Sequence, residues 1–495
     1  MLRKIRISLA AIFFLCITLL FLDFTGTIHS YFGWMVSIQF VPALLALNVG
    51  IVVGLIVLTL LLGRIYCSVV CPLGVMQDVI SWISRKRQKC RYSYSKPKTW
   101  LRLTMLVVFV STMLLGVGAI GVLIAPYSAY GRIAANLFAP IYGYINNALA
   151  YLAERADSYA FYETRVYINS LATFVVAVVT FIVISVFAWR GGRTYCNTIC
   201  PVGTILGYLS KFSFLKPVID KSKCGGCKLC ERSCKSSCID AANSSIDYTR
   251  CVSCMNCLDV CKKGAISYCR PVKNDIVARK TSEDRRQFLT VAGATLAAAV
   301  MEASDKTVDG GLAILEEKKE PNRTVPILPP GAISLQHFTE HCTACQLCVR
   351  ACPSNVLVGT SSFERFMQPQ LSYTQGFCRP ECTKCGEVCR TSAISSLSME
   401  RKNMRKIGTV VWTRANCLIF NDEIECGNCA RHCPNGAISM QPLDPNDSES
   451  GEYKRNIFIP VINSERCIGC GACEYACPAR PSALVVNGIE EQREI

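Results

Sequence analysis

The sequence predicts an α-helical membrane domain of four to five spans, joined to smaller α+β domains that are rich in cysteine. Two observations support this prediction. Four stretches of the 495-residue chain are apolar over about 20 residues, the length that crosses a bilayer as a helix. Of the 32 cysteines, 24 fall into six groups of four with short internal spacings. Tight groups in a long chain are typical of metal or cluster ligands and not of a disulfide framework.

The four apolar stretches cover residues 7–24, 43–62, 103–124 and 168–189. Basic residues precede the first stretch, as in a signal peptide, but no small-residue cleavage site follows it. We therefore interpret it as a span that stays in the protein. A shorter apolar run at residues 290–301 is a possible fifth segment. Residues 1–215 form the predicted membrane domain with its duplicated motifs.

The net charge of +17 is best explained by a membrane surface, and we expect no nucleic acid as a partner. The basic residues stand beside the apolar stretches and are not interleaved with stacking aromatic residues. Loops that stay in the cytoplasm carry an excess of Lys and Arg. Seven such residues lie from Arg85 to Lys98, whereas none lies between Asp23 and Pro42. Both ends of the four-span domain are therefore expected on the cytoplasmic side.

A motif occurs twice in this domain, at residues 63–74 and 192–203, with seven identities. Each copy has the pattern Cys-x3-Cys-Pro and follows a span predicted to end on the cytoplasmic side. The cysteines of the two copies can therefore meet; they are Cys67, Cys71, Cys196 and Cys200. Because proline favours the first turn of a helix, a helix should begin directly after each second cysteine. Three roles stay open: a metal or redox site, a reversible dithiol, or buried inert thiols.

Two cysteine runs follow the last span, each with the spacing Cys-x2-Cys-x2-Cys-x3-Cys. Their members are Cys224, Cys227, Cys230 and Cys234, and Cys251, Cys254, Cys257 and Cys261. This is the spacing of bacterial two-cluster ferredoxins, in which the fourth cysteine of each run binds the other cluster. We predict a ferredoxin-like domain at residues 216–275, with Cys261 beside the first triplet and Cys234 beside the second. Zinc is the alternative metal, although zinc ribbons use separated pairs of cysteines.

This domain departs from the ferredoxin pattern in two ways. Lys235 and Lys262 stand where a proline usually follows the fourth cysteine. Cys238 is close enough in sequence to replace Cys234 as a ligand, or it is a bystander. The isolated thiols elsewhere are Cys16, Cys90 and Cys269.

Arg285 and Arg286 precede Phe288, Leu289 and an apolar run, and so resemble a twin-arginine export signal placed inside the chain. Such a signal, or a membrane segment, would occupy residues 280–303. It suits a domain that must cross the membrane folded around its clusters. The alternative is a cytoplasmic amphipathic helix, because the run is short for a span. If the signal is used, the linker at residues 304–335 and all that follows lie outside the cytoplasm.

Four more quartets follow the linker, and each ends with the spacing Cys-x2-Cys-x3-Cys. They are Cys342, Cys345, Cys348 and Cys352; Cys378, Cys382, Cys385 and Cys389; Cys417, Cys426, Cys429 and Cys433; and Cys467, Cys470, Cys473 and Cys477. Short echoes such as Gly-Ala-Ile-Ser follow several runs, which indicates one repeated cluster-binding unit. We predict a second ferredoxin-like α+β domain at residues 336–495 with four 4Fe–4S clusters. Clusters held by four cysteines leave no open position for a substrate, so the predicted role is electron transfer.

With these motifs, residues 1–275 resemble the NapH-type membrane ferredoxins of periplasmic nitrate reductase systems, which have four spans, paired Cys-x3-Cys-Pro motifs and two clusters. Residues 280–495 resemble the partner NapG-type ferredoxin, which begins with a twin-arginine signal and holds four clusters. The chain looks like a natural fusion of the two. The resemblance implies six 4Fe–4S clusters. In the second half it implies that the first quartet pairs with the fourth, and the second with the third.

The resemblance also implies a quinol dehydrogenase component in the bacterial inner membrane. Electrons would pass from menaquinol through the clusters to a periplasmic reductase or cytochrome, with residues 216–275 cytoplasmic and residues 304–495 periplasmic. Related families act in nitrous-oxide reduction, methylamine oxidation and copper-oxidase assembly, so the acceptor is open. Two alternatives are an electron relay from a cytoplasmic donor and an assembly or metal-handling factor.

The sequence identifies no catalytic residue, and whether the chain is itself an enzyme stays open. No residue in the predicted spans marks a quinone site. His29 and Asp23, near the predicted outer face, are able to take quinol protons, although a histidine in a loop is more often merely solvated.

Overall fold

The computed structural model describes residues 2–23, 26–88, 92–114, 118–158, 161–164, 166, 170–270, 308–309, 313–314, 318, 320–362, 364–422, 424–443 and 457–495. The predicted twin-arginine segment, part of the predicted linker and Cys90 lie outside these ranges.

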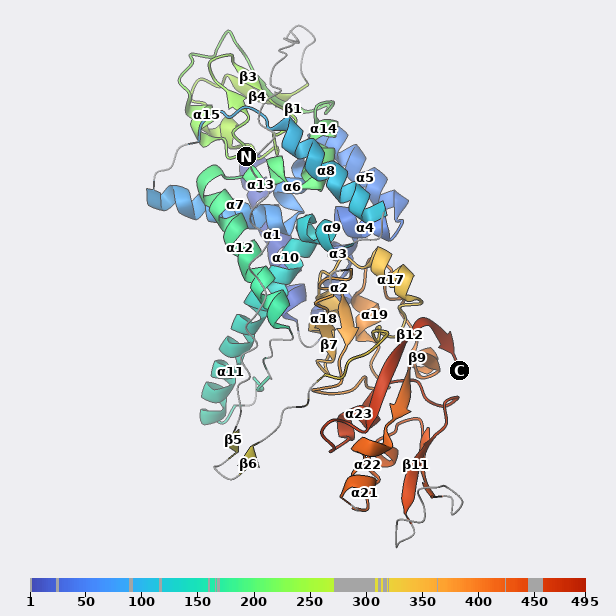
Figure 1. Ribbon diagram of the computed structural model, residues 1–495. Coiled ribbons are helices and arrows are strands. Elements are labelled where there is room, and N and C mark those ends of the chain that lie inside the picture. Colours follow the sequence, from blue (N-terminus) through green and yellow to red (C-terminus); the bar gives the residue numbers. More distant parts are fainter. Residues whose placement is uncertain are drawn as a thin grey trace.

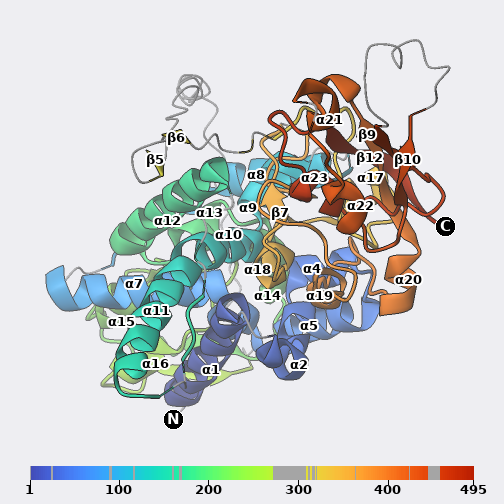
Figure 2. The same ribbon diagram turned by 90° about the horizontal axis from the view of Figure 1, so that it is seen from below.

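Three parts follow one another along the molecule (Figure 1). The helical domain, residues 2–215, lies in the middle. The small cysteine-rich domain, residues 216–270, lies at one end of it, and the large cysteine-rich domain, residues 320–495, lies at the other. Helix α11 projects from the same end of the helical domain as the large domain, but on a different side (Figures 1 and 2).

The helical domain consists of helices of very unequal length. In chain order they are α1 (Leu2–Leu22), α2 (Thr27–Phe32), α3 (Trp34–Ser37), α4 (Phe40–Leu45), α5 (Val49–Leu62), α6 (Ile65–Val69), α7 (Pro72–Gln88), α8 (Thr99–Leu114), α9 (Gly118–Ile124), α10 (Pro126–Ile133), the π-helix η1 (Ala134–Phe138), α11 (Ala139–Arg155), α12 (Leu171–Gly191), α13 (Thr194–Thr198) and α14 (Pro201–Ser210). Helices α7 and α14 begin at the prolines that follow the second cysteine of each motif copy, as predicted.

Two helices are long and apolar enough to cross a membrane, α1 and α12, with 21 residues each. The second predicted span is divided, because Leu47 adopts a left-handed backbone conformation and Asn48 caps the start of α5. Helices α5 and α8, from the second and third predicted spans, are apolar but shorter. Among the described residues the structure thus supports two candidate spans, and the count of four to five stays a prediction.

The exposed faces of α1, α5 and α12 carry large apolar side chains. Leu9 and Leu15 on α1, Val53 and Val57 on α5, and Val179 on α12 are each at least 44% exposed. Apolar surface of this kind marks contact with a partner or a membrane. These faces are therefore suited to lipid.

The small domain has two similar halves. In each half a loop of cysteines leads into a short helix, α15 (Leu229–Ser233) or α16 (Asn256–Val260). Two antiparallel pairs of strands complete it: β1 (Lys216–Ile219) with β4 (Ile266–Cys269), and β2 (Ile239–Asp240) with β3 (Ser245–Ile246). This is the α+β arrangement predicted for residues 216–275.

The large domain is also built from short helices and two-stranded sheets. Its elements are α17 (Leu335–His341), α18 (Leu347–Ala351), β7 (Leu357–Gly359), β8 (Pro369–Leu371), α19 (Lys384–Val388), α20 (Met399–Asn403), β9 (Arg405–Trp412), the 3-10 helix η3 (Arg414–Asn416), α21 (Leu418–Asn421), α22 (Asn428–Arg431), β10 (Ile438–Pro442), β11 (Phe458–Ile462), α23 (Ala472–Ala476) and β12 (Leu484–Glu494). Strand β7 pairs with β8, β9 with β12, and β10 with β11, all antiparallel. In the linker, β5 (Val308–Asp309) pairs with β6 (Ala313–Ile314).

The helical and large domains share one hydrophobic core. The largest cluster of buried residues includes Phe21 and Tyr127 of the helical domain together with Phe338 and Leu347 of the large domain. A continuous buried core gives two domains a fixed relative position, unlike the small polar contact of loosely tethered domains. The large domain is therefore docked on the ends of the helices.

One buried carboxylate joins the helical domain to the small domain. Asp78 on α7 forms ion pairs with Arg6 of α1 (3.2 Å), with Arg193 of the second motif copy (2.6 Å) and with Lys235 of the small domain. Burial alone raises the pKa of Asp78, but the charges of Arg193 and Lys235 outweigh this effect and hold the pKa well below its usual range. In addition, the backbone N–H of Arg193 donates to the carbonyl of Lys235 (2.8 Å).

Replacing Asp78 by asparagine should be strongly destabilising. Asp78→Asn keeps the shape of the side chain but leaves three buried cations without their carboxylate, which we expect to lower the free energy of unfolding by about 3–5 kcal/mol. Denaturant unfolding in detergent measures this change. Asp259→Asn is the matched control, because its ion pair with Arg3 (3.0 Å) joins side chains that are both at least 40% exposed. It should cost at most about 1 kcal/mol, and equal stability of the two variants would contradict the anchoring role of Asp78.

Candidate electron-transfer centres

The first triplet of the small domain surrounds a cavity together with a cysteine of the second run. Cys224, Cys227, Cys230 and Cys261 line this cavity of about 190 Å³. The chain reverses at Lys228, whose backbone is left-handed, and so turns the loop around the cavity before α15 begins. The four thiols are the set that the spacing predicts for one cluster.

The second triplet of the small domain meets two further thiols. Cys234 lies close enough to Cys254 and Cys257 for their charges to interact, as the crossed pattern predicts. Cys238 is buried beside it, with its Sγ atom 3.5 Å from the Sγ atom of Cys234, and it also contacts Cys251. Five thiols thus gather at this site, and either Cys234 or Cys238 is placed to be the fourth ligand.

The large domain pairs its quartets differently from the expectation that the resemblance gave. Cys389, from the second quartet, lines a cavity with Cys342, Cys345 and Cys348 of the first. In return, Cys352 of the first quartet lies beside Cys382 and Cys385 of the second.

The third and fourth quartets exchange cysteines in the same way. Cys433 lines a cavity with Cys467, Cys470 and Cys473, whereas Cys477 lies beside Cys417 and Cys426. The pairing of first with fourth and second with third was therefore wrong: consecutive quartets pair, as in the small domain. In three of the four quartets the short helix ends at the fourth cysteine in extended conformation, which directs that cysteine away from its own triplet. Which neighbouring triplet receives it depends on how the loops pack against one another.

The repeated Gly-Ala-Ile-Ser segments serve these sites. The backbone N–H of Ala265 donates to the Sγ atom of Cys261 (3.3 Å), and that of Ala437 donates to the Sγ atom of Cys433 (3.2 Å). Hydrogen bonds to cluster sulfur atoms are one of the factors that set reduction potentials. Each of these repeated segments therefore supplies a backbone N–H donor to the fourth cysteine of its run, which joins the other triplet.

The described thiols suit clusters better than single ions. In this part of the chain no three His, Cys, Asp or Glu side chains are close enough to hold one metal ion. Three of the sites are instead cavities with four thiols around each. A 4Fe–4S cluster is held by four thiolates and, when bound, accepts and donates one electron at a time.

The two copies of the duplicated motif meet inside the helical domain, as predicted. Their thiols, Cys67, Cys71, Cys196 and Cys200, form a tetrad in which each residue is only 4% exposed. Burial raises the pKa of Cys71 and Cys200, which disfavours the thiolate that a reversible dithiol needs. The same effect disfavours the thiolate ligands of a metal, so the three roles of metal or redox site, reversible dithiol and inert thiols all stay open.

Two buried arginines cross between the motif copies. Arg193 Nη1 donates to the carbonyl of Cys67 (2.7 Å), and Arg64 Nη2 donates to the carbonyl of Cys196 (3.2 Å). Each guanidinium also lies against the thiol of its own copy, at 3.7 Å from Cys196 Sγ and 3.9 Å from Cys67 Sγ respectively. The tetrad is therefore enclosed by two positive charges in a nearly twofold arrangement.

Two glycines make room for these arginines. A Cβ atom at Gly74 would lie 2.5 Å from Arg193 Nη1, and a Cβ atom at Gly203 would lie 2.9 Å from Arg64 Nη2. Each would also collide with the cysteine carbonyl that the arginine binds. The glycines that close the motif are thus required by the crossed contacts.

The tetrad lies between the small domain and the large domain. On one side, Arg64 Nη1 donates to the carbonyl of Thr249, two residues before Cys251. On the other side, Tyr66 lies beside Cys71 and near Tyr127, and Tyr127 lies near Cys345. The chain thereby places buried thiols and aromatic rings between the two sets of cluster sites.

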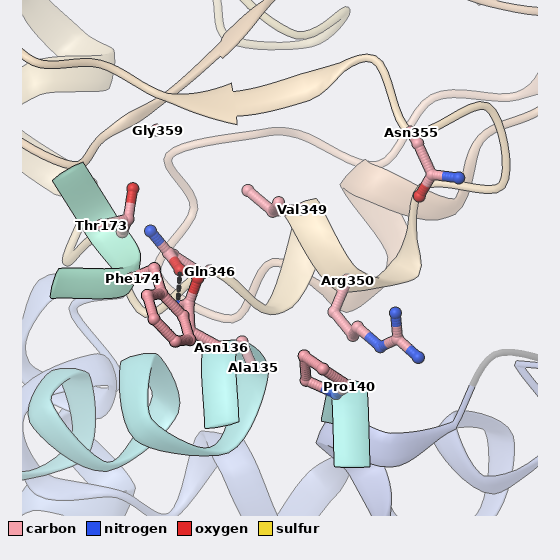
Figure 3. A pocket seen from close by; sticks show the side chains of 10 residues that line it. All are labelled: Ala135, Asn136, Pro140, Thr173, Phe174, Gln346, Val349, Arg350, Asn355 and Gly359. Atoms are coloured by element: carbon pink, nitrogen blue, oxygen red, sulfur yellow. Dashed lines mark hydrogen bonds between the residues drawn. The ribbon is translucent and has the colours of Figure 1, made fainter. Parts of the chain in front are cut away.

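The cluster loop of the large domain is held directly by the helical domain. Asn136 Nδ2 donates to Gln346 Oε1 (2.7 Å), beside Cys345 (Figure 3). The same figure shows a narrow pocket at this contact, between Thr173 and Phe174 of α12 and Arg350 of α18. His29 and Asp23 also meet at this end of the helical domain, with His29 Nδ1 3.4 Å from Asp23 Oδ2.

Models of iron–sulfur domains match several parts of the chain. One model of a 4Fe–4S binding domain matches residues 44–90 and 173–219, once over each motif copy. A further 4Fe–4S binding domain matches residues 245–267 and 335–358, and a 4Fe–4S dicluster domain matches residues 424–480. No solved structure matches the chain.

Several curated proteins match this chain over most of their own length. The methylamine utilization ferredoxin-type protein MauM of Methylobacillus flagellatus is 30% identical over 189 residues, which make up 36% of this chain and 74% of the relative. The ferredoxin-type protein NapG of Escherichia coli is 30% identical over 36% of this chain and 79% of the relative. The chain belongs to this family of ferredoxin-type proteins. Its relative NapF of E. coli is 29% identical over 31% of this chain and 80% of the relative.

As a member of the ferredoxin-type family, the chain is an iron–sulfur electron-transfer protein, and the resemblance to Nap-type ferredoxins is confirmed. Sequence reasoning missed four residues of the tetrad's surroundings. Arg64 and Arg193, like Gly74 and Gly203, are identical between the motif copies, and this identity was a usable signal. Asp78 has no such signal, because the equivalent position in the second copy is Gly207.

Adding a methyl group at the motif glycines should separate the two copies. We expect Gly74→Ala and Gly203→Ala each to lower the free energy of unfolding by about 1–3 kcal/mol, because the new Cβ atom displaces a buried arginine and a carbonyl. Gly54→Ala is the control, since nothing lies within 4 Å of a Cβ atom there. Unfolding in detergent measures all three, and motif variants as stable as Gly54→Ala would contradict the crossed contacts.

Proposed function

We propose that the chain is a multi-pass protein of the bacterial inner membrane that takes electrons from menaquinol and passes them through six 4Fe–4S clusters to a periplasmic reductase or cytochrome. The observation that carries the proposal is that the two cysteine-rich domains lie at opposite ends of the helical domain (Figure 1). A protein that conducts electrons away from a membrane needs clusters in contact with its membrane part. In this chain the loop of Cys345 lies against the helical domain.

The contacts of two loops support the proposed orientation. In the basic loop after α7, the backbone N–H of Tyr92 donates to the carbonyl of Arg232, and that of Ser95 donates to the carbonyl of Ser237 (both 3.3 Å). The loop that the positive-inside rule assigns to the cytoplasm therefore lies on the small domain. The loop without basic residues, around His29, instead faces the large domain. The orientation that the basic residues predict therefore agrees with the small domain on the cytoplasmic side and the large domain on the opposite side.

The apolar helices support a membrane position for the central domain. Helices α1 and α12 have the length of a span, and the exposed faces of α1, α5 and α12 are apolar. In this proposal the shorter helices α5 and α8 complete a four-span domain, with residues 216–275 cytoplasmic and residues 304–495 periplasmic. The twin-arginine segment would direct the large domain outward.

A relay from a cytoplasmic donor is the second candidate, and one observation favours it. Cys227 is exposed at the surface of the small domain, so a cluster held with Cys224, Cys230 and Cys261 would be open to a soluble partner. Metal handling by the tetrad receives less support, because exchange with a partner requires access and each of the four residues is 4% exposed. The tetrad is better suited to a step inside the protein.

Iron content and quinol-dependent reduction test the main proposal. Anaerobically purified protein should contain about 24 iron atoms per chain, and menadiol should bleach its visible absorption. Alkaline phosphatase should be active when fused after residue 495 and inactive after residue 270. Reduction by dithionite but not by menadiol would favour the relay, and activity of neither fusion would contradict the orientation.

Removing tetrad thiols tests whether electrons cross the helical domain. In the double variant Cys67→Ser and Cys196→Ser, electrons that enter the clusters of one cysteine-rich domain should no longer cross to those of the other. Bleaching by menadiol should then stop short of the wild-type level, by about a third if the quinol reduces the four clusters of the large domain and by about two thirds if it reduces the two of the small domain. Dithionite bleaching and iron content should not change. Cys16→Ser, an isolated thiol on α1, is the control, and full bleaching of the double variant would assign the tetrad a structural role.

A further inference from the structure

A cavity of about 240 Å³ lies between the helical domain and the large domain. Its lining residues are Asp23, Gly26, His29 and Ser30 of the helical domain, and Ala351, Lys384, Glu387, Val388 and Arg390 of the large domain. Both domains therefore contribute polar side chains to it. A cavity with a few convergent polar groups at a domain boundary is a common form of ligand site.

Asp23 fixes the orientation of His29 in this cavity. The carboxylate of Asp23 accepts hydrogen bonds from the backbone N–H groups of Gly26 and Ile28 (2.9 Å each). Its Oδ2 atom lies 3.4 Å from His29 Nδ1. An ionised carboxylate only accepts hydrogen bonds, so this contact assigns the ring proton to Nδ1 and leaves Nε2 as an acceptor. Among the described residues, Nε2 of His29 is buried and has no hydrogen-bond partner.

The charges around His29 keep a neutral imidazole available. Burial lowers the pKa of His29, and the hydrogen bond and charge of Asp23 oppose this effect. The positive charges of Arg390 and Lys384 lower the pKa further, and the net direction is downward. Glu387 is the remaining charged group that lines the cavity. A neutral imidazole with a free lone pair is able to accept a proton from a hydroxyl group.

Two groups of cluster ligands adjoin the same cavity. Val388 and Arg390 flank Cys389, which joins the first triplet of the large domain. Ala351 precedes Cys352, which lies beside the second triplet. An electron that leaves a ligand in this cavity therefore has a short path to either site.

Two aromatic residues that follow His29 in the chain are exposed. Tyr31 on α2 is 76% exposed and Trp34 on α3 is 52% exposed, next to His29 in the chain. Exposed tyrosine and tryptophan are enriched where a protein meets the membrane–water interface. A ligand whose tail stays in the lipid would thus be able to place its ring in the cavity.

From these observations we propose that the cavity binds and oxidises a quinol, with His29 as the catalytic residue that accepts its protons and Asp23 as the positioning residue. This inference rests on the proposed function. Oxidation of one quinol to quinone breaks two O–H bonds and releases two electrons and two protons. Two oxidised 4Fe–4S clusters, one electron each, balance the electrons. His29 Nε2 takes the protons in turn and releases each to water at the mouth of the cavity, beside the exposed Ser30.

The test uses the full chain with its clusters and two separate readouts. The first is binding of the quinol analogue heptyl-hydroxyquinoline N-oxide, measured by the quenching of its fluorescence. The second is the rate of bleaching by menadiol. We expect His29→Gln to weaken binding of the analogue by about tenfold. It should slow bleaching by menadiol by about a hundredfold or more. Iron content and bleaching by dithionite should stay at the wild-type level. His432→Gln, an exposed histidine of the large domain, is the matched control and should not differ from wild type.

Asp23→Asn provides a second, independent variant. The bleaching rate in wild type should rise with pH as His29 loses its proton. Because Asp23 raises the pKa of His29, its replacement should move this rise to lower pH, which a purely structural role would not do.

The outcomes separate the cavity from the function on which it rests. If wild type binds the analogue and is bleached by menadiol, but His29→Gln and Asp23→Asn behave like wild type, the cavity is not the quinol site and the proposed function stands. If wild type is bleached by dithionite alone and does not bind the analogue, the proposed function is wrong and this inference falls with it.

Discussion

The crossed pair of buried arginines, Arg64 and Arg193, is the contact on which the rest of the arrangement depends. A buried guanidinium is costly unless its donors find acceptors, and each of these groups donates to a cysteine carbonyl of the other motif copy. Neither copy can therefore hold its thiols in place without the other. The small domain also interacts with both arginines. Its Lys235 shares the carboxylate of Asp78 with Arg193, and its Thr249 carbonyl accepts a hydrogen bond from Arg64. Tetrad and small domain are thus expected to fold as one unit.

Both cysteine-rich domains are rigidly attached to the helical domain. Electron transfer between centres requires short and constant separations, which a flexible tether does not give. At the far end the constancy comes from apolar packing, because Tyr127 and Phe338 belong to one core. The hydrogen bond from Asn136 to Gln346 adds direction to that packing. The chain therefore uses buried charge on one side and a shared apolar core on the other.

Spacing predicted the local chemistry well, because cysteines in one loop are held together by the chain itself. The triplet of Cys224, Cys227 and Cys230 is of this kind, and the helix starts at Pro72 and Pro201 are equally local. The crossing of Cys261 to this triplet was predicted from the two-run ferredoxin pattern. Relations between loops could not be read in this way. The pairing of the four later quartets depends on which loops fold side by side, and the expected order was wrong. The division of the second apolar stretch depends on the backbone at Leu47, which mean hydropathy does not register.

The departure from the ferredoxin pattern at Lys235 has a physical reason in this fold. A proline after Cys234 would supply no charge, whereas lysine there forms the ion pair with Asp78. Lys262, at the equivalent place in the other run, is exposed. The two motif copies differ correspondingly, because Gly207 stands at the position equivalent to Asp78. A Cβ atom at Gly207 would lie 2.8 Å from Arg102 Nη2. Arg102 itself binds the side chain and the carbonyl of Thr249. The nearly symmetric tetrad thus binds the small domain through two different contacts, the ion pair of Lys235 with Asp78 and the carbonyl of Thr249 that Arg64 and Arg102 share. These contacts fix one orientation of the small domain. In this orientation the cluster site of Cys234 lies next to the tetrad.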